Sequence, residues 1–132
     1  MALPISRSPF TGVTASALHT LDWNSDGQAD IVAGEHPRER AFVVLGSTAL
    51  SGTANIMDRA NWIITGENVG DQFGYSLGSG DLDVDGAADL IIGARSHNVN
   101  DHSNNFEDAG AVYVLYGWGQ RKVHLPLVMR SP

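Results

Sequence analysis

Residues 80–94 read GDLDVDGAADLIIGA, an acidic loop built around a glycine and followed directly by an apolar run. The same order recurs 59 residues earlier, where residues 22–34 read DWNSDGQADIVAG, so that Asp22 corresponds to Asp81. Oxygen ligands at alternate positions, a glycine that lets the chain reverse and a final carboxylate are what a loop needs to bind a hard cation such as Ca²⁺. Two copies at a fixed offset indicate a repeat protein.

Each loop offers side-chain oxygens at positions 1, 3, 5 and 9 and a backbone carbonyl at position 7. The predicted metal ligands are Asp22, Asn24, Asp26, Gln28 and Asp30 in the first loop and Asp81, Asp83, Asp85, Ala87 and Asp89 in the second. Because Asn24 replaces a carboxylate, the first site is expected to bind more weakly. Mg²⁺ fits less well because it keeps its waters. We therefore expect two Ca²⁺ ions with a structural role. Simple turn formation explains one such loop but is disfavoured for a matched pair.

EF-hand and dockerin loops open with the same D-x-[DN]-x-D-G pattern. They require an acidic ligand at position 12 and helices on both sides. Position 12 is Ala33 in the first loop and Ile92 in the second, and both belong to apolar runs typical of strands. The sequence therefore excludes these helical calcium motifs.

Composition limits the class of protein. The chain has 132 residues, no cysteine, a net charge of −7 and a pI near 4.9, with seven of its fifteen acids in the two loops. This acidity argues against nucleic acid and anionic membranes as partners, and no apolar run is long enough to span a bilayer. Disulfides and thiolate metal sites are excluded. The N-terminus lacks the order of a signal peptide, so we expect a piece of a longer exported protein.

Short β-branched runs separated by glycine and Asn/Asp turns predict an all-β fold. The strongest strand signals are at Ile31–Ala33, Ala41–Leu45, Trp62–Thr65, Leu90–Ile92 and Ala111–Tyr116, and weaker ones are at Thr14–Leu21 and Tyr75–Gly80. The outer strands of the second blade are expected at Phe73–Gly80 and Val123–Val128. A turn or two of helix is expected around residues 54–60. The second repeat is longer than the first by 12 residues, which fall in the polar loop Arg95–Asp108.

A family resemblance emerges from the second repeat. Phe73-Gly74, then residues 80–94, then the strand ending at Gly117 resemble an FG-GAP repeat of the integrin alpha-subunit type, with Arg95 in place of the final Pro. The first repeat is more divergent, since Thr14-Ala15 stands where Phe-Gly is expected. The resemblance implies that each acidic loop joins the first two strands of a blade in a calcium-binding β-propeller.

We therefore expect two four-stranded antiparallel blades, with repeat one at about 14–66 and repeat two at about 73–128 of a single segment covering 1–132. Two blades cannot close a propeller, so self-association or the remaining blades of a parent protein are expected. The resemblance implies a non-enzymatic role in adhesion or ligand recognition at a cell surface or outside the cell, with a protein or carbohydrate ligand that the sequence does not identify. The alternatives are a non-catalytic accessory region of a secreted enzyme acting on polysaccharides or lipids, and a structural spacer.

Three other features have competing interpretations. The five histidines lack zinc-site spacing, so His97 and His102 are expected to be surface or turn residues. Trp23 is expected to pack against its own blade rather than to form an exposed ligand contact. The Arg95–Asp108 loop is either a binding loop or a mobile segment.

Overall fold

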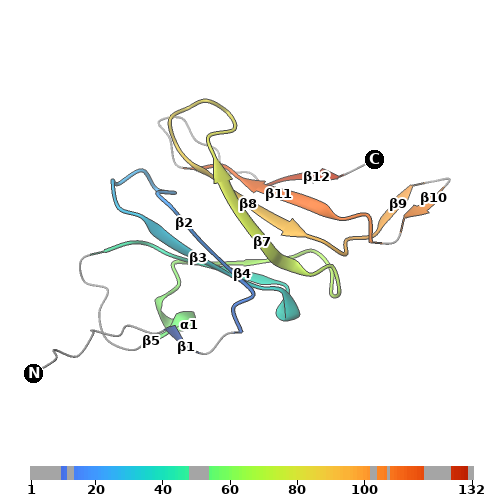
Figure 1. Cartoon of the computed structure of the whole chain (residues 1–132), viewed down its shortest axis with the longest axis horizontal. Coiled ribbons are helices and arrows are strands. Elements are labelled where there is room, and N and C mark those ends of the chain that lie inside the picture. The colour runs from blue at the N-terminus through green and yellow to red at the C-terminus, as the bar shows by residue number, and fades with distance from the viewer. Residues whose placement is uncertain are drawn as a thin grey trace, which may run out of the picture.

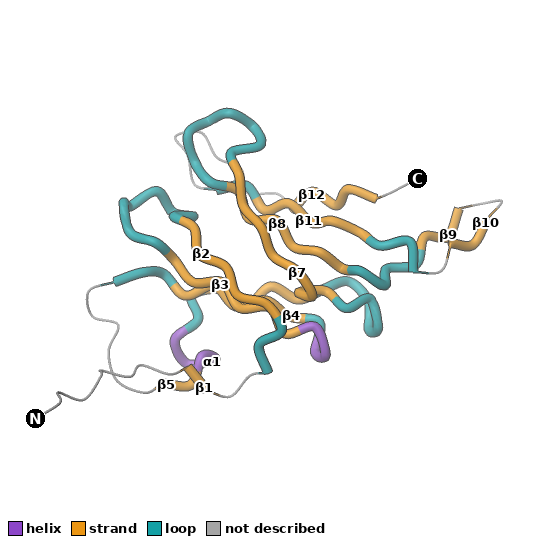
Figure 2. Tube along the Cα trace, in the orientation of Figure 1, coloured by secondary structure: helices purple, strands orange, loops and turns teal. Residues whose placement is uncertain are grey.

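Two four-stranded antiparallel sheets form the computed structural model, which describes residues 10–11, 14–47, 54–101, 104–106, 108–117 and 126–130 (Figures 1 and 2). The first sheet has the order β2 (Ala17–Leu21), β3 (Asp30–Glu35), β4 (Arg40–Val44) and β6 (Trp62–Thr65). The second has the order β7 (Phe73–Gly80), β8 (Asp89–Ala94), β11 (Ala111–Leu115) and β12 (Pro126–Arg130). The expected all-β fold with two four-stranded blades is confirmed.

Several short elements lie outside the two four-stranded sheets. β1 (Phe10–Thr11) pairs in parallel with β5 (Ala54–Asn55), and α1 (Ile56–Arg59) follows directly, where a short helix was predicted. Asn55 caps α1 by accepting a hydrogen bond from the Met57 backbone N–H. The 3₁₀ turn η1 (His36–Arg38) connects β3 to β4. The polar loop Arg95–Asp108, where the second repeat is longer than the first, contains an antiparallel pair, β9 (Val99–Asp101) and β10 (Asn104–Phe106). The sequence did not predict this pair.

The ends of the predicted strands lie within three residues of the observed ends, and Trp62–Thr65 and Phe73–Gly80 match in full. β2 begins at Ala17 rather than at Thr14, and β8 extends from Asp89 to Ala94, beyond the predicted apolar run. The fourth strand of the second sheet covers 126–130, while residues 123–125 of its predicted span lie outside the described residues.

The two sheets pack face to face through alternate side chains. Val32 and Val43 of the first sheet join Leu90, Ile92 and Tyr113 of the second in one buried cluster. The opposite face of the first sheet is covered by a second cluster, in which Ala33, Phe42 and Val44 pack against Ile56 of α1. The apolar run of β3 is therefore buried on both faces, as expected for a strand between two layers. Each fully buried large apolar side chain contributes about 1.5–3 kcal/mol.

A buried carboxylate joins the start of the second sheet to the first. Glu39, in the turn before β4, accepts hydrogen bonds from the backbone N–H groups of Gly70 (3.0 Å), Gln72 (3.1 Å) and Phe73 (2.7 Å). Its own backbone is left-handed, with φ of 58°. Hydrogen bonds to a charged group contribute more to stability than neutral ones. The Glu39 side chain therefore holds the segment that leads into β7 against the first sheet.

Candidate metal centre

Both acidic loops connect the first two strands of their sheets, β2 to β3 and β7 to β8, and both project from the same end of the molecule (Figure 1). Gly27 and Gly86, at position 6, each have φ of +88°, so the predicted chain reversal at glycine is confirmed. Position 4 is also left-handed, with φ of 58° at Ser25 and 56° at Val84. No sequence pattern predicts this conformation, because a β-branched residue such as Val84 rarely adopts it.

Position 1 of each loop organises the turn. Asp22 Oδ1 accepts the N–H of Asp26 (3.1 Å) and its Oδ2 accepts the N–H of Gly27 (2.8 Å). Asp81 makes the matching bonds to the N–H groups of Asp85 (3.0 Å) and Gly86 (2.8 Å). A carboxylate oxygen has two lone pairs, so each of these oxygens can still accept a cation.

Position 9 ties each loop to the third strand of its sheet. Asp30 and Asp89 are both 0% exposed. Asp89 Oδ2 accepts the N–H of Leu82 (2.7 Å), while its Oδ1 accepts the N–H of Gly117, just beyond β11 (2.8 Å). Asp30 makes the equivalent pair of bonds in the first repeat, both at 2.8 Å. Both carboxylates are therefore structural, and their role as metal ligands stays a prediction.

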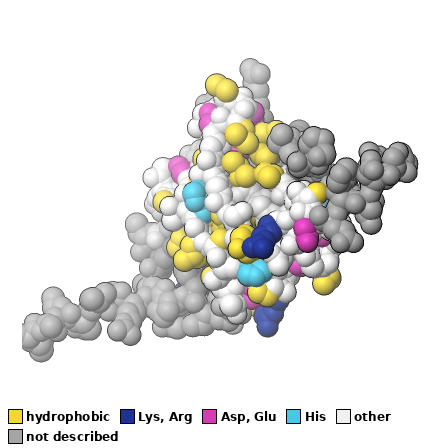
Figure 3. All heavy atoms as spheres, turned by 45° about the vertical axis from the view of Figure 1, so that its right-hand side comes forward, with side chains coloured by type: hydrophobic (Ala, Val, Ile, Leu, Met, Phe, Trp, Pro, Cys, Tyr) yellow, Lys and Arg dark blue, Asp and Glu magenta, His cyan; other side chains and the backbone are white. Residues whose placement is uncertain are grey.

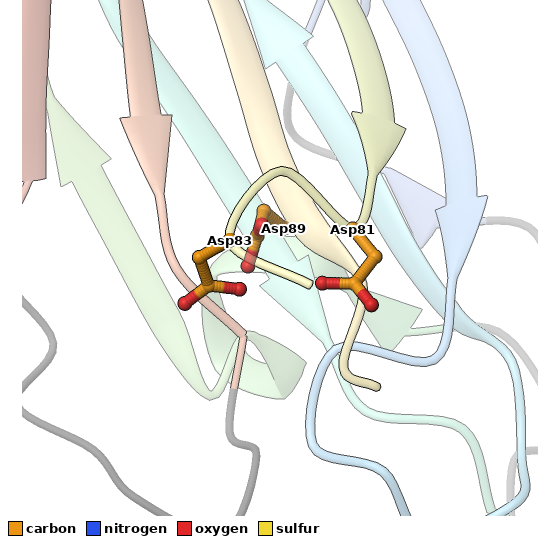
Figure 4. A group of neighbouring side chains, drawn as sticks. All are labelled: Asp81, Asp83 and Asp89. Atoms are coloured by element: carbon orange, nitrogen blue, oxygen red, sulfur yellow. The ribbon is translucent and has the colours of Figure 1, made fainter. Parts of the chain in front are cut away.

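Three carboxylates converge in the second loop. Asp81, Asp83 and Asp89 each place one carboxylate oxygen within 4.8 Å of the others, and Figure 4 shows the three side chains around a common space. Ca²⁺ binds oxygens at 2.3–2.6 Å, so two ligands of one ion lie at most about 5 Å apart. Like charges at this separation repel one another, and a cation between them removes that repulsion.

The first loop has an amide where the second has Asp83. Asn24 Nδ2 donates to Asp26 Oδ2 (3.1 Å), which fixes the orientation of the amide. Asn24 Oδ1 is buried and accepts no hydrogen bond from the described residues. The Gln28 backbone N–H, and next the Asn24 amide, hold the pKa of Asp26 below its usual value. A buried carbonyl oxygen without a donor beside an ionised carboxylate suits a cation ligand.

Position 7 contributes a backbone N–H in this structure. The N–H of Gln28 donates to Asp26 Oδ1 (2.8 Å), and that of Ala87 donates to Asp85 Oδ1 (3.0 Å). These bonds tighten the second half of each loop and bring residue 7 next to residue 5. The role of the two carbonyls as ligands stays a prediction.

Two glycines that complete the loops were missed as functional positions. A Cβ atom on Gly46 would lie 2.0 Å from the Ala29 carbonyl oxygen, and one on Gly117 would lie 2.0 Å from that of Ala88. Only glycine allows the strand end to approach so closely and donate its N–H to the position 9 carboxylate. The sequence does contain a signal for these two positions, because both predicted third strands end at a glycine.

Trp23 connects the first loop to both sheets. It is 4% exposed and packs edge-to-face on Trp62 of its own sheet, with ring centroids 5.1 Å apart. Its packing against its own blade is therefore confirmed. Its indole N–H also donates to the Leu115 carbonyl of the second sheet (3.4 Å), a contact that the sequence could not predict.

His97 was predicted to be a surface or turn residue, and it closes the turn after β8, where its N–H donates to the Ala94 carbonyl oxygen (3.4 Å). The surface alternative is wrong. The side chain of His97 is buried, and its Nδ1 lies 2.6 Å from Asp71 Oδ2 in the segment before β7. The two residues are 26 positions apart, so no local pattern reveals the pair. His102 lies outside the described residues.

Comparison with known proteins agrees with this geometry. The family model described as FG-GAP repeat matches residues 73–115, which include β7, the second acidic loop, β8 and β11. The chain belongs to the FG-GAP repeat family of the integrin alpha type. The model's match starts at Phe73 and so includes the Phe-Gly pair that carried the sequence resemblance.

Similar full-length proteins are integrin alpha chains. The chain is 34% identical to Integrin alpha-PS2 of Drosophila melanogaster over 76% of its length, and 35% identical to Integrin alpha ina-1 of Caenorhabditis elegans over 83%. It is 31% identical to Integrin alpha-5 of Xenopus laevis over 70%. The matches span only 7%, 10% and 8% of those relatives. Among the described residues, no helix has the length and apolarity needed to cross a membrane.

Proposed function

We propose that the two loops of this FG-GAP segment bind one Ca²⁺ each. Two observations support the sites. Carboxylate oxygens of Asp81, Asp83 and Asp89 lie within 4.8 Å of one another, and Asn24 Oδ1 of the first loop is buried without a donor among the described residues. The convergence of the three carboxylates is the observation on which the proposal chiefly depends. The ligands are those predicted from the sequence, with Gln28 and Ala87 contributing backbone carbonyls.

Calcium in these loops has a structural role. Each loop leads into a strand that contributes to the core between the sheets, and Trp23 of the first loop contacts both sheets. A cation that holds the loop carboxylates together therefore stabilises the packing between the sheets. Because it binds the folded chain and not the unfolded one, its binding free energy adds to the stability of the fold.

The proposed setting is an extracellular or cell-surface adhesion protein, in which this segment is a non-catalytic part of the ligand-recognition region. Its support is the similarity to integrin alpha chains and the calcium chemistry. Extracellular calcium modules bind with a Kd of about 10⁻⁴–10⁻³ M, which keeps such sites filled outside cells and largely empty in a cytosol. The proposed partner is a protein or carbohydrate ligand.

Thermal melts in chelator and in about 2 mM Ca²⁺ test the calcium proposal. For a Kd of about 10⁻⁴–10⁻³ M, each site adds about 0.6–1.8 kcal/mol, and two sites together raise Tm by about 5–13 °C. Asp85→Ala is expected to lose about half of this rise, whereas Asp58→Ala, an exposed acid outside the loops, keeps all of it. Identical wild-type curves in chelator and in Ca²⁺ would show the proposal to be wrong.

A further inference from the structure

Position 2 of the first acidic loop is held by three of the proposed calcium ligands. Trp23 stands between Asp22 and Asn24 in the chain, and its backbone N–H donates to Oδ2 of Asp30 (2.8 Å). A cation that fixes the side chains of these ligands therefore also fixes the backbone of Trp23, and with it the direction of the indole ring.

The indole ring of Trp23 reaches the second sheet at the end of β11. Trp23 is 4% exposed, it belongs to the buried cluster between the sheets, and its indole N–H donates to the Leu115 carbonyl oxygen (3.4 Å). Leu115 is the last residue of β11 and packs against the same cluster. The first loop therefore helps to hold this end of the strand in place.

The second loop holds the same end of the strand. Oδ1 of Asp89 accepts the N–H of Gly117 (2.8 Å), two residues beyond Leu115. Gly117 is buried, and a Cβ atom on it would lie 2.0 Å from the carbonyl oxygen of Ala88, so the two backbones touch. Residues 115–117, which we call the shared strand end, are therefore bonded to both loops.

The position 2 side chain of the second loop makes no comparable link. Leu82 has the equivalent backbone bond, since its N–H donates to Asp89 Oδ2 (2.7 Å). However, Leu82 is 52% exposed and Val84 is 87% exposed. Figure 3 shows hydrophobic side chains at the surface of this loop, at the top of the molecule. The link between the loops therefore depends on Trp23 and not on its counterpart in the second repeat.

We propose that the two calcium sites are coupled through Trp23 and the shared strand end, so that Ca²⁺ in the second loop raises the affinity of the first. The ion that binds first orders the shared strand end, and the other ion then binds a chain in which this segment is already ordered. The effect is reciprocal, because the coupling free energy belongs to both sites. The inference rests on the proposed binding of one Ca²⁺ by each loop.

Coupling changes how the chain responds to calcium. The first site has Asn24 where the second has Asp83, so it is expected to be the weaker site and to fill after the second. When the filled second site raises the affinity of the first, both sites fill over a narrower range of Ca²⁺ concentration than two independent sites would. Trp23 then makes the packing between the two sheets respond to that range.

Amide NMR spectra of the whole chain measure the two loops separately. The N–H of Gly27 donates to Asp22, and that of Gly86 donates to Asp81. The two glycine resonances therefore report the filling of the two loops. CaCl₂ is titrated into the protein, and a dissociation constant is obtained for each loop from its own glycine.

Replacing both Asp83 and Asp85 by Asn disables the second loop. The Asn side chain at position 85 still has an oxygen that can accept the Ala87 N–H, so the turn keeps this bond. In this variant we expect the first loop to bind Ca²⁺ about threefold to tenfold more weakly than in the wild type, which is the effect of one neutral hydrogen bond.

Trp23→Phe tests the route of the coupling. Phe keeps an aromatic ring in the cluster but has no N–H for the Leu115 carbonyl. When the second loop is disabled in a chain that carries Trp23→Phe, the affinity of the first loop is expected not to change further. The matched control is Phe42→Leu, which removes a buried ring from the cluster beside α1 on the opposite face of the first sheet. This control is expected to keep the full effect.

Two results would overturn the proposal. Equal affinity of the first loop with and without a working second loop would show that the sites are independent. A loss of affinity that persists in full with Trp23→Phe would show that any coupling takes another route. These results differ from a failure of the calcium proposal itself, in which neither glycine resonance shifts when Ca²⁺ is added to the wild type.

Discussion

Replacing Asp89 by Asn separates the structural role of the position 9 carboxylate from its role as a metal ligand. Asp89 is fully buried and accepts the N–H groups of Leu82 (2.7 Å) and Gly117 (2.8 Å). Asn has the same shape as Asp but only one side-chain oxygen. One of the two buried backbone N–H groups therefore loses its acceptor and faces the N–H of the Asn side-chain amide. A lost hydrogen bond to a charged group contributes about 1.5–3 kcal/mol, and the unsatisfied donor adds to this cost. We expect a loss of about 2–4 kcal/mol in chelator.

Urea unfolding followed by tryptophan fluorescence measures this loss. With an m-value of about 2 kcal/mol per M, the midpoint is expected to fall by about 1–2 M. The matched control is Asp83→Asn, which gives the second loop the amide that the first has at Asn24. Asp83 is exposed, so this variant is expected to lose under about 0.5 kcal/mol in chelator. It is expected to lose only part of the Ca²⁺-dependent increment, because its second loop then has the ligand types proposed for the first. Equal losses for the two variants in chelator would refute the structural role of Asp89.

Three further predictions concern the backbone and the buried acids. Val84→Asn is expected to stabilise the chain by about 1 kcal/mol in urea unfolding, since Asn tolerates the left-handed φ of 56°, while Leu82→Asn, at an ordinary φ, is expected not to stabilise it. Glu39→Ala is expected to cost about 2–4 kcal/mol by leaving three N–H groups without their acceptor, and an unchanged midpoint would contradict this. Burial alone raises the pKa of Glu35, but the Thr14 N–H and Arg40 outweigh it and lower that pKa below its ordinary 4.5. The stability that Glu35 provides is therefore complete above about pH 4.5 and is lost as the pH falls through the lowered pKa, so the difference in unfolding free energy between wild type and Glu35→Gln should be smaller at pH 3 than at pH 7.

Much of the fold was predictable because its signals are local. β3 and β8 are short apolar runs directly after an acidic loop. Because the two runs stand at matching positions in the two repeats, they indicate strands rather than helices. Gly27 and Gly86 were predicted to turn the chain because position 6 of such loops needs a positive φ. The hairpin of β9 and β10 was missed because its polar residues show no alternation of apolar and polar side chains.

The contacts that could not be predicted join residues far apart in the chain. Asp71 and His97 form a buried pair across 26 positions, and Glu39 binds N–H groups more than thirty residues away. From the sequence alone, each of these side chains is expected at the surface, because charged residues are rarely buried without a partner. Only the tertiary fold supplies the partners: Asp71 and His97 flank β7 and β8 of the second sheet, and Glu39 lies beside β4 of the first.

The count of Ca²⁺ ions bound per chain is the most direct test of the two-site account. Equilibrium dialysis at about 5 mM Ca²⁺ nearly saturates sites with a Kd of 10⁻³ M or lower. We predict about two ions for the wild type, and about one when Asp81 and Asp83 are both replaced by Asn. A wild-type count near zero, or a count that the double replacement leaves unchanged, would contradict the account.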